Sequence, residues 1–354
     1  MTINQIAMTP AEQTVAKCAD LYARYGYRRF TMNKFEDYAL YAENKNFLVD
    51  GRLLIFTDGA KLKALKPDIT LSIVKGLAAD PKLPLKAFYN ETVYRVKKGE
   101  KEFSELHQMG LELIGDGSIY AISEVICLAK TSLDAIDAQN ILDISHMGIL
   151  MPLVDQACQA GVDRSELIAL ITQKNADGLA SLLGKQNVLV TLVSSYAPIG
   201  QMIPLLQQML PESQAVRELT QIADVLYAMQ LDSKVYLDFS LMHDIGYYNG
   251  IIFKGYIKGV PVPVLSGGRY DPLLDRFGFN AAALGFAIYL DYITYAEAKQ
   301  DHDVLLLYTA DDSAADIACA VKLLTTQGYC VLAAQSAPPH RSFIGVFHTK
   351  EVLA

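Results

Sequence analysis

The sequence contains no tryptophan and no long apolar run, and it is poor in cysteine. The absence of tryptophan excludes no class of function. No apolar stretch reaches the roughly 20 residues that a membrane-spanning helix needs. The first residues, Met1–Gln5, do not place a basic segment before an apolar one. We therefore expect neither a membrane span nor a signal peptide.

Cysteine occurs at scattered positions, odd in number, and no two of them have the spacing of a metal site. The positions are Cys18, Cys127, Cys158, Cys319 and Cys330. Their neighbours are mostly apolar, which favours buried free thiols in a reducing compartment over a disulfide framework. We expect a cytoplasmic protein without a metal site.

Positive charge is also scarce. The chain has 31 Lys and Arg against 39 Asp and Glu, a net charge of −8 and a pI near 5.3. Broad binding to a phosphate backbone needs clustered Lys and Arg, so tRNA is not an expected partner. Half of the 354 residues are hydrophobic and no polar low-complexity tract interrupts them, which predicts a large globular core.

A long antiparallel hairpin is predicted over Phe88–Gly115. Its first arm ends in Thr92–Val96, its loop is the charged segment Lys97–Glu105, and its return arm is Leu106–Ile114. The loop carries enough charge to lie in water. We expect the rest of the chain to be organised around this hairpin.

Alternation along the return arm separates two faces, because successive strand side chains point in opposite directions. The face typical of a core comprises His107, Met109, Leu111 and Leu113. The other face places the amide of Gln108 and the carboxylate of Glu112 on either side of Gly110. On the residues alone, this is either a partly solvated sheet face or a place where a small polar molecule lies over Gly110.

Other segments alternate between helical and extended patterns. Helical spacing follows the capping box Thr9-Pro10-Ala11-Glu12 and recurs over Thr70–Ala78, Ser118–Asp137 and most of Met151–Gln230. Strands are predicted at Asn140–Ile144, Val235–Phe239 and Gly250–Lys258, and Leu284-Gly285-Phe286 is interpreted as the lead-in to a helix. Strands joined largely by hairpins, with helices outside them, indicate an α+β fold with an antiparallel sheet.

Two domains are expected, over residues 1–300 and 301–354. Residues 151–230 form a helical insertion in the first domain. The second domain is a small α/β tail, predicted from a strand at Val304–Tyr308, a helix at Ser313–Thr326 and strands at Tyr329–Ala334 and Phe343–Phe347. About fifty residues are few for a free-standing domain, so we expect the tail to pack on the body or on a partner.

Four stretches follow one another in a characteristic order. They are Leu65–Thr70, the hairpin with Tyr94-Arg95 and Gln108-x-Gly110-x-Glu112, Tyr247-Tyr248-Asn249, and Gly267–Asp271. Together they resemble the catalytic domain of histidyl-tRNA synthetase, a class II aminoacyl-tRNA synthetase, over about Thr9 to Tyr295. The resemblance implies an antiparallel sheet flanked by helices, and a tail related to the anticodon-binding domain but truncated.

The resemblance also implies the remnant of a histidine pocket. Asp68, Thr70 and Gln108 match the residues that hold the amino group of histidine, and Glu112 and Tyr248 match those that address its imidazole. The predicted set as a whole is Asp68, Thr70, Arg95, Gln108, Glu112, Tyr247, Tyr248 and Tyr270. Each also has a purely structural interpretation, such as helix capping for Asp68 and Thr70.

Departures from the synthetase pattern fall on the groups that handle ATP. His243 stands where the histidine-specific motif has an arginine, and Tyr292 stands where the third class II motif has another. Tyr289 fills a glycine position beside it, and the second motif ends in Lys97 in place of an acid. Losing one preorganised charge clamp costs about a hundredfold to a thousandfold in rate, so no catalytic residue is expected.

A chain that keeps the amino-acid pocket and loses the ATP clamps resembles the regulatory subunits of ATP phosphoribosyltransferase. This second resemblance implies a non-catalytic subunit that needs no cofactor. The implied partners are a short-form ATP phosphoribosyltransferase catalytic subunit, a second copy of the chain within a mixed assembly, and histidine as feedback inhibitor. The implied role is activation in the first step of histidine biosynthesis.

Two alternatives stay open on the sequence. One is an active histidyl-tRNA synthetase with unusual motifs, which would require that two arginines be replaced without loss of function. The other is an amino-acid sensor for an unrelated partner. The sequence does not decide whether histidine would bind in the old pocket or between subunits.

Overall fold

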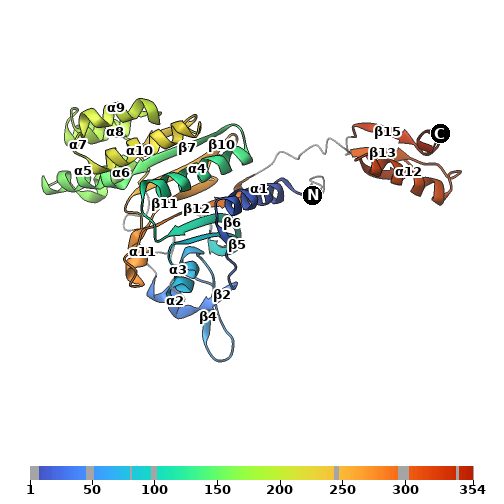
Figure 1. Cartoon of the computed structure of the whole chain (residues 1–354), viewed down its shortest axis with the longest axis horizontal. Helices are drawn as coiled ribbons and strands as arrows, with labels where there is room; N and C mark the ends of the chain where they lie inside the picture. The colour runs from blue at the N-terminus through green and yellow to red at the C-terminus, as the bar shows by residue number, and fades with distance from the viewer. Residues whose placement is uncertain are drawn as a thin grey trace. The chain divides into compact units, whose positions relative to one another are not determined.

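The computed structural model describes residues 8–44, 52–79, 82–96, 102–242, 247–293, 303–339 and 343–353. The chain divides into two compact units, Thr14–Thr294 and a smaller one that comprises Met1–Gln13 and Tyr295–Ala354 (Figure 1). The predicted domain limits at residues 300, 151 and 230 stay predictions. Met1–Gln5, Lys97 and His243, named above, lie outside the described residues.

Within the described residues, the larger unit is built on a nine-stranded sheet. In spatial order its strands are β1 (Arg28–Arg29), β5 (Leu85–Val96), β6 (Phe103–Ile114), β12 (Ala283–Tyr289), β11 (Leu265–Arg269), β10 (Ile251–Ile257), β7 (Asn140–His146), β9 (Val235–Asp238) and β8 (Tyr196–Pro198). The pairs β1–β5 and β7–β9 are parallel and the others antiparallel. The predicted α+β class is confirmed.

The central hairpin is formed by β5 and β6, which are longer than predicted. They pair without interruption from Leu85↔Ile114 to Val96↔Phe103, so the return arm begins at Phe103 and not at Leu106. The charged loop is correspondingly shorter. Gly110 pairs with Tyr89 on β5 and Ala287 on β12, so these three residues lie on one sheet face.

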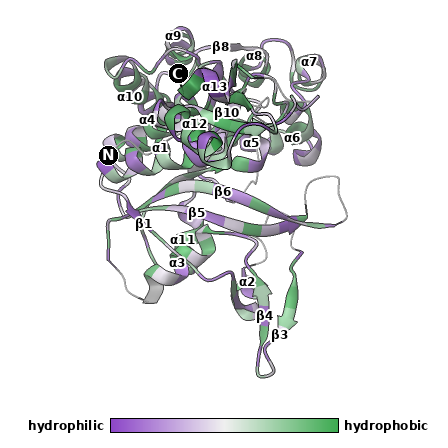
Figure 2. Cartoon of the chain, turned by 90° about the vertical axis from the view of Figure 1, so that its right-hand side faces the viewer, coloured by the Kyte–Doolittle hydropathy of each residue, from purple (hydrophilic) through white to green (hydrophobic). Residues whose placement is uncertain are grey.

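Helices cover both faces of the sheet (Figure 2). Those of the larger unit are α1 (Pro10–Arg24), α2 (Tyr38–Glu43), α3 (Thr70–Ala79), α4 (Ile119–Ile136), α5 (Met147–Gln159), α6 (Arg164–Thr172), α7 (Ala176–Leu183), α8 (Val188–Ser194), α9 (Ile199–Met209), α10 (Gln214–Ala228), α11 (Asp271–Arg276) and the 3₁₀ helix η3 (Leu290–Tyr292). The capping box is present, with the backbone N–H of Thr9 donating to Glu12 at 2.7 Å. None of the helices in the described part of the chain combines the length and apolar character that crossing a bilayer requires.

The core face predicted from the alternation is confirmed for Met109, Leu111 and Leu113 but is wrong for His107, which is exposed near the start of β6. Met109 and Leu111 are fully buried, and the α1 residue Tyr22 packs edge-on to Phe88 and Phe286 on this side of the sheet. The opposite face is also closed: Gln108 and Glu112 are each only 3% exposed. The interpretation of this face as a solvated surface is therefore wrong.

Two expectations about local structure need correction. Leu284-Gly285-Phe286 lies in strand β12 and does not lead into a helix, because an apolar run of this length fits a buried strand as well as a helix. The predicted helical stretch 151–230 is interrupted by β8, which adds an edge strand to the main sheet by pairing with β9.

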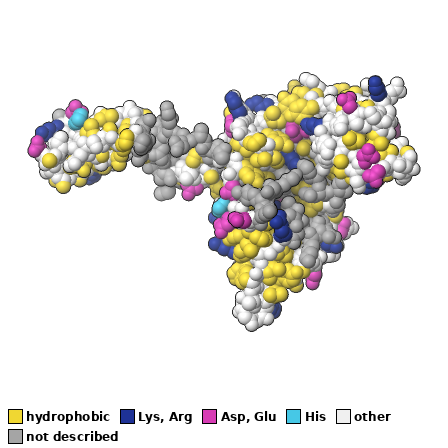
Figure 3. Space-filling view, turned by 180° about the vertical axis from the view of Figure 1, so that it is seen from behind, with side chains coloured by type: hydrophobic (Ala, Val, Ile, Leu, Met, Phe, Trp, Pro, Cys, Tyr) yellow, Lys and Arg dark blue, Asp and Glu magenta, His cyan; other side chains and the backbone are white. Residues whose placement is uncertain are grey.

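A small sheet in the order β2–β4–β3 stands apart from the main sheet. Its strands are β2 (Phe35–Asp37), β3 (Ile55–Thr57) and β4 (Leu62–Leu65). It exposes the apolar side chains of Phe35, Ile55, Phe56 and Leu62. Figure 2 shows that its strands are largely hydrophobic, and Figure 3 shows hydrophobic side chains on the surface of this region. Thr57 and Leu62 are paired where β3 and β4 meet at the Asp58-Gly59 turn.

The smaller unit contains the predicted strand–helix–strand. Its elements are β13 (Asp303–Leu307), α12 (Ala314–Thr326), β14 (Cys330–Ala334), β15 (Gly345–His348) and α13 (Thr349–Leu353). The strands are parallel in the order β14–β13–β15, and Val304, Leu306, Ala320 and Leu324 form its core. The third strand begins two residues later than predicted, and α13 was not predicted.

Candidate amino-acid site

The start of α3 is fixed by the carboxylate of Asp68. Its Oδ1 accepts a hydrogen bond from the backbone N–H of Leu71 at 2.9 Å, in the first turn of the helix. Its Oδ2 lies 3.5 Å from the Arg95 guanidinium, which also donates to the carbonyl of Pro67. The structural interpretation of Asp68 as a helix cap therefore describes how this residue is held, and Arg95 is held by its ion pair with the same carboxylate.

Glu112 is the centre of the site. Its Oε1 accepts from the Thr70 hydroxyl at 3.0 Å, and its Oε2 accepts from the Tyr270 hydroxyl at 2.5 Å. Burial raises the pKa of Glu112 to about 8, and the two hydroxyl donors oppose this shift. One carboxyl group thus joins α3, β6 and the end of β11.

Tyrosines form the wall beside this carboxyl group. Tyr247 stacks on Tyr270 with ring centroids 5.6 Å apart, and Tyr248 meets Tyr247 edge-on at 4.7 Å. Burial raises the pKa of Tyr247 and Tyr270 well above the usual value, so both hydroxyls are neutral donors. Tyr248 also lies against Gly268, where an added Cβ would come within 2.8 Å of the ring.

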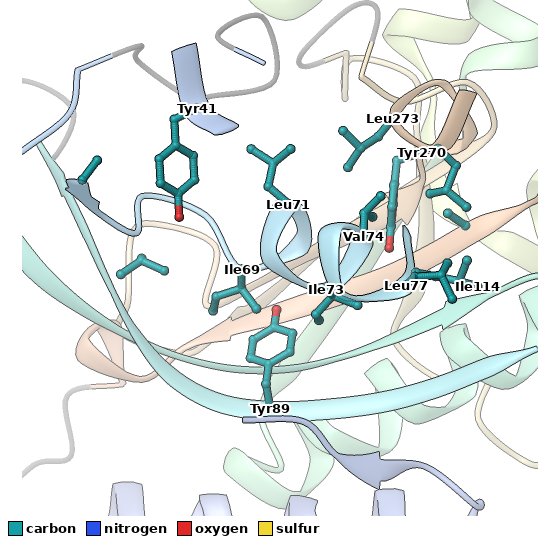
Figure 4. Close-up of a cluster of buried hydrophobic side chains, with 14 of the residues drawn as sticks. Tyr41, Ile69, Leu71, Ile73, Val74, Leu77, Tyr89, Ile114, Tyr270 and Leu273 are labelled. Atoms are coloured by element: carbon teal, nitrogen blue, oxygen red, sulfur yellow. The ribbon is translucent and has the colours of Figure 1, made fainter. Parts of the chain in front are cut away.

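The space over Gly110 is filled by Tyr89. An added Cβ at Gly110 would lie 2.6 Å from the Tyr89 hydroxyl oxygen and 2.0 Å from the carbonyl oxygen of Phe286. Figure 4 shows Tyr89 pointing from β5 towards α3, into the cluster that contains Ile69 and Ile73. The expectation that a small molecule lies directly over Gly110 is wrong for this structure, because the neighbouring strand supplies the side chain that occupies the place.

Gln108 lies on the same strand face as Glu112, towards the opposite end of the site. The residue is only 3% exposed, and no described residue hydrogen-bonds to its side-chain amide. A buried amide with unused donors and acceptor is suited to a polar ligand. The amide of Gln108 is therefore available to hydrogen-bond to a ligand, since it makes no hydrogen bond with the described side chains.

The structure brings the predicted residues together in two connected groups. Thr70, Glu112, Tyr270, Tyr247 and Tyr248 form one, and Asp68 with Arg95 forms the other at the start of α3. Two further residues shape the site and are not among the predicted ones: Tyr89, and Gly285, where an added Cβ would lie 1.8 Å from Glu112 Oε2. The hairpin register, which sets Tyr89 opposite Gly110, was a signal for Tyr89, whereas Gly285 is placed opposite Glu112 by the pairing of β12 with β6.

Tyr289 and Tyr292, which the resemblance places where a synthetase would handle ATP, pack on one another. The rings of Tyr289 and Tyr292 lie 5.7 Å apart, and Asp291 between them accepts from the backbone N–H of His107 at 2.7 Å. Asp291 also lies 3.0 Å from His107 Nδ1. This acid therefore ties η3 to β6, and the adjoining tyrosines offer no cation for a triphosphate.

A family model described as histidyl-tRNA synthetase matches residues 6–293. The ATP phosphoribosyltransferase regulatory subunit of Alkaliphilus metalliredigens is 30% identical over 291 residues, which cover 78% of this chain and 74% of that protein. The chain belongs to the ATP phosphoribosyltransferase regulatory subunit family. The regulatory subunit of Caldanaerobacter subterraneus is 26% identical over 302 residues, which cover 80% and 78% of the two chains.

Solved structures show the same fold. A Bacillus halodurans chain described as an ATP phosphoribosyltransferase regulatory subunit/histidyl-tRNA synthetase has a TM-score of 0.72 at 24% identity, over 96% of this chain and 93% of that one. A chain of the Thermotoga maritima ATP phosphoribosyl transferase (HisG:HisZ) complex has a TM-score of 0.62 at 19% identity, over 79% and 97%. The predicted class II synthetase-like fold is confirmed.

Proposed function

We propose that this chain binds and activates a short-form ATP phosphoribosyltransferase catalytic subunit in the first step of histidine biosynthesis. It also takes part in feedback inhibition by histidine, and it has no catalysis of its own. The family to which the chain belongs supports this role, as does its fold likeness to a chain of the HisG:HisZ complex.

One observation carries the proposal: the buried acid of the expected histidine pocket keeps its partners, whereas tyrosines replace the arginine and the glycine expected near ATP. Glu112 keeps the hydroxyl partners Thr70 and Tyr270, whereas Tyr289 and Tyr292 pack together where ATP would need a cation. Activation of an amino acid requires both the Glu112 site and a site for ATP. Recognition of the amino acid without activation requires only the Glu112 site.

Histidine is the ligand whose chemistry fits the Glu112 site. A carboxyl group with a pKa near 8 can accept from or donate to an imidazole nitrogen near neutral pH, and a free amide at Gln108 can hold the amino group. Entry requires that Tyr89 move from its place against Gly110, or that the ligand bind beside it. A ligand that selects a minor open state couples binding to a change of state, which is what feedback control requires.

The assembly is tested by co-expressing the chain with a short-form catalytic subunit and separating the products by size. We expect a stable hetero-oligomer that contains at least two copies of each chain, and a larger or smaller species when histidine is added. Two separate peaks at every ratio would contradict the proposal. Capture of a different protein from native extract in place of the catalytic subunit would support the alternative of a sensor for an unrelated partner.

The absence of catalysis is tested by histidine-dependent exchange of pyrophosphate into ATP. The expected result is exchange no faster than in a sample without protein, because tyrosines replace the arginine and the glycine expected near ATP. Exchange above that background would establish an active synthetase and overturn the proposed role.

A further inference from the structure

A second polar site lies on the same sheet face as Glu112, at the other side of β12, β11 and β10. It is a cleft of about 430 Å³. Its walls come from β7, β8, β9, β10 and the turn after α6, and they comprise Ile141, Asp143, Thr172, Lys174, Tyr196, Asp238, Ser240, Leu241, Lys254 and Tyr256. The register Gly110↔Ala287, Ser266↔Lys254 and Lys254↔Asp143 places this "Asp143 cleft" about 20 Å from β6. This size suits a small organic ligand.

One carboxylate oxygen of Asp143 is available to accept a hydrogen bond from a ligand. The residue is 7% exposed, and its Oδ1 accepts from the Tyr196 hydroxyl at 2.9 Å. Its Oδ2 has no hydrogen-bond partner among the described residues. This oxygen is not among the fully buried side-chain atoms that lack a partner, and Asp143 lines the cleft, so Oδ2 is accessible from it. A ligand that brings both a donor and a positive charge can form a charge-assisted hydrogen bond there.

The neighbouring carboxylate is satisfied from within the chain. Asp238 Oδ1 accepts from the backbone N–H and the hydroxyl of Ser240 at 3.0 and 2.7 Å, and its Oδ2 binds the Lys174 ammonium at 2.7 Å. That ammonium also lies 5.0 Å from the centroid of the Tyr196 ring. The cleft therefore already accommodates one primary ammonium between a carboxylate and an aromatic face.

We propose that the Asp143 cleft binds a small organic molecule with a primary ammonium group, which donates to Asp143 Oδ2. The ligand repeats at Asp143 the arrangement that Lys174 makes at Asp238. Its apolar part lies along Ile141 and Tyr256, of which Ile141 is 37% exposed. This site is separate from the proposed histidine site and does not depend on it.

The ionisation of Asp143 makes the binding sensitive to pH. Tyr196 from β8, Asp238 and Tyr236 from β9, Lys254 and Tyr256 from β10, and Lys174 from the turn after α6 surround it. Burial, together with the Asp238 charge, raises the pKa of Asp143 to about 6, against the Tyr196 hydrogen bond and the Lys174 charge. An ammonium ligand needs the carboxylate, so affinity falls as the pH drops through 6.

The test uses the full chain with n-butylammonium as probe and 1-butanol as its uncharged counterpart, both measured by ligand-observed NMR. We expect saturable binding of butylammonium and at least about tenfold weaker binding of butanol. The Asp143→Asn variant, which keeps the shape and the acceptor for Tyr196, should lose at least about tenfold in affinity. Asp224→Asn, a change at an exposed acid on α10, should bind as the wild type does.

A second variant keeps the test independent of how well Asp143→Asn folds. Tyr196→Phe removes a hydrogen bond that lowers the pKa of Asp143, so the pH at which half of the butylammonium affinity is lost should rise. Equal binding of butanol and butylammonium would overturn the proposal. Unchanged affinity in Asp143→Asn, or an unchanged pH midpoint in Tyr196→Phe, would also overturn it.

Discussion

The Thr70 hydroxyl donates to Glu112 Oε1 at 3.0 Å across 42 residues of sequence. The second oxygen of the same carboxyl group accepts from Tyr270, a further 158 residues along the chain. Three segments of the larger unit therefore meet at one buried acid. Predictions about this acid test both the packing of the fold and the proposed ligand site.

The pH dependence of stability should report the buried acid. The pKa of Glu112 is about 8 in the folded chain and near 4.5 when exposed. Between these values the folded chain keeps a proton that the unfolded chain releases, so raising the pH destabilises the fold. This group should lower the free energy of unfolding by about 1.4 kcal/mol per pH unit from pH 5 to pH 8.

Urea denaturation of wild type and Glu112→Gln across this range measures the effect. Glutamine is neutral at every pH and still accepts a hydrogen bond, so the variant should lose this slope. Parallel curves for the two proteins would show that Glu112 titrates as an ordinary carboxylate, and the account of its burial would be wrong.

Gly110→Ala should destabilise the fold by about 3 kcal/mol, because the added methyl group meets the Phe286 carbonyl at 2.0 Å and Tyr89 at 2.6 Å. Gly200 in α9 is the matched control, since an added Cβ there has no neighbour within 4 Å. Gly200→Ala should raise stability by about 0.5–1 kcal/mol through helix propensity. Similar effects of the two changes in thermal unfolding would contradict the close packing at Gly110.

The carboxylate of Asp68 should matter for α3 mainly as an acceptor. Asp68→Ala removes the bond from Leu71 N–H and should cost about 1 kcal/mol of stability. Asp68→Asn retains an acceptor and loses only the partly exposed pair with Arg95, so its cost should be clearly smaller. A larger loss in Asp68→Asn than in Asp68→Ala, measured by denaturation, would reverse this assignment.

Histidine binding to the isolated chain is predicted to depend on Glu112. Calorimetry should show at least about tenfold weaker binding in Glu112→Ala, because a charge-assisted or neutral hydrogen bond to the imidazole is lost. Glu212→Ala changes an exposed glutamate before α10 and should leave the affinity unchanged. If Glu112→Ala binds histidine as tightly as wild type, histidine binds elsewhere, for example between subunits.

The alternation along β6 correctly predicted which side chains share a face, because a period of two leaves no choice once the strand is assigned. The residue that fills the space over Gly110 was missed, since Tyr89 reaches it through the register of the neighbouring strand. Leu284–Phe286 was assigned to a helix because a short apolar run has no decisive period. Patterns in the sequence could not bring Thr70, Glu112 and Tyr270 together; the family resemblance did so.

The Asp143 cleft shows a different limit. Its lining residues span Ile141 to Tyr256 and are separated by the helices α5 to α10. No short motif contains them, and β8, which supplies Tyr196, was not predicted at all. Such a site depends on strand order, which local sequence patterns do not specify.

The most direct test of the central proposal is the rate of phosphoribosyl-ATP formation by a short-form catalytic subunit, measured with and without this chain at saturating substrates. We expect that adding the chain raises the rate, that histidine lowers the raised rate, and that this inhibition is weakened in Glu112→Ala. A rate that stays the same at every ratio of the two proteins would contradict the proposal.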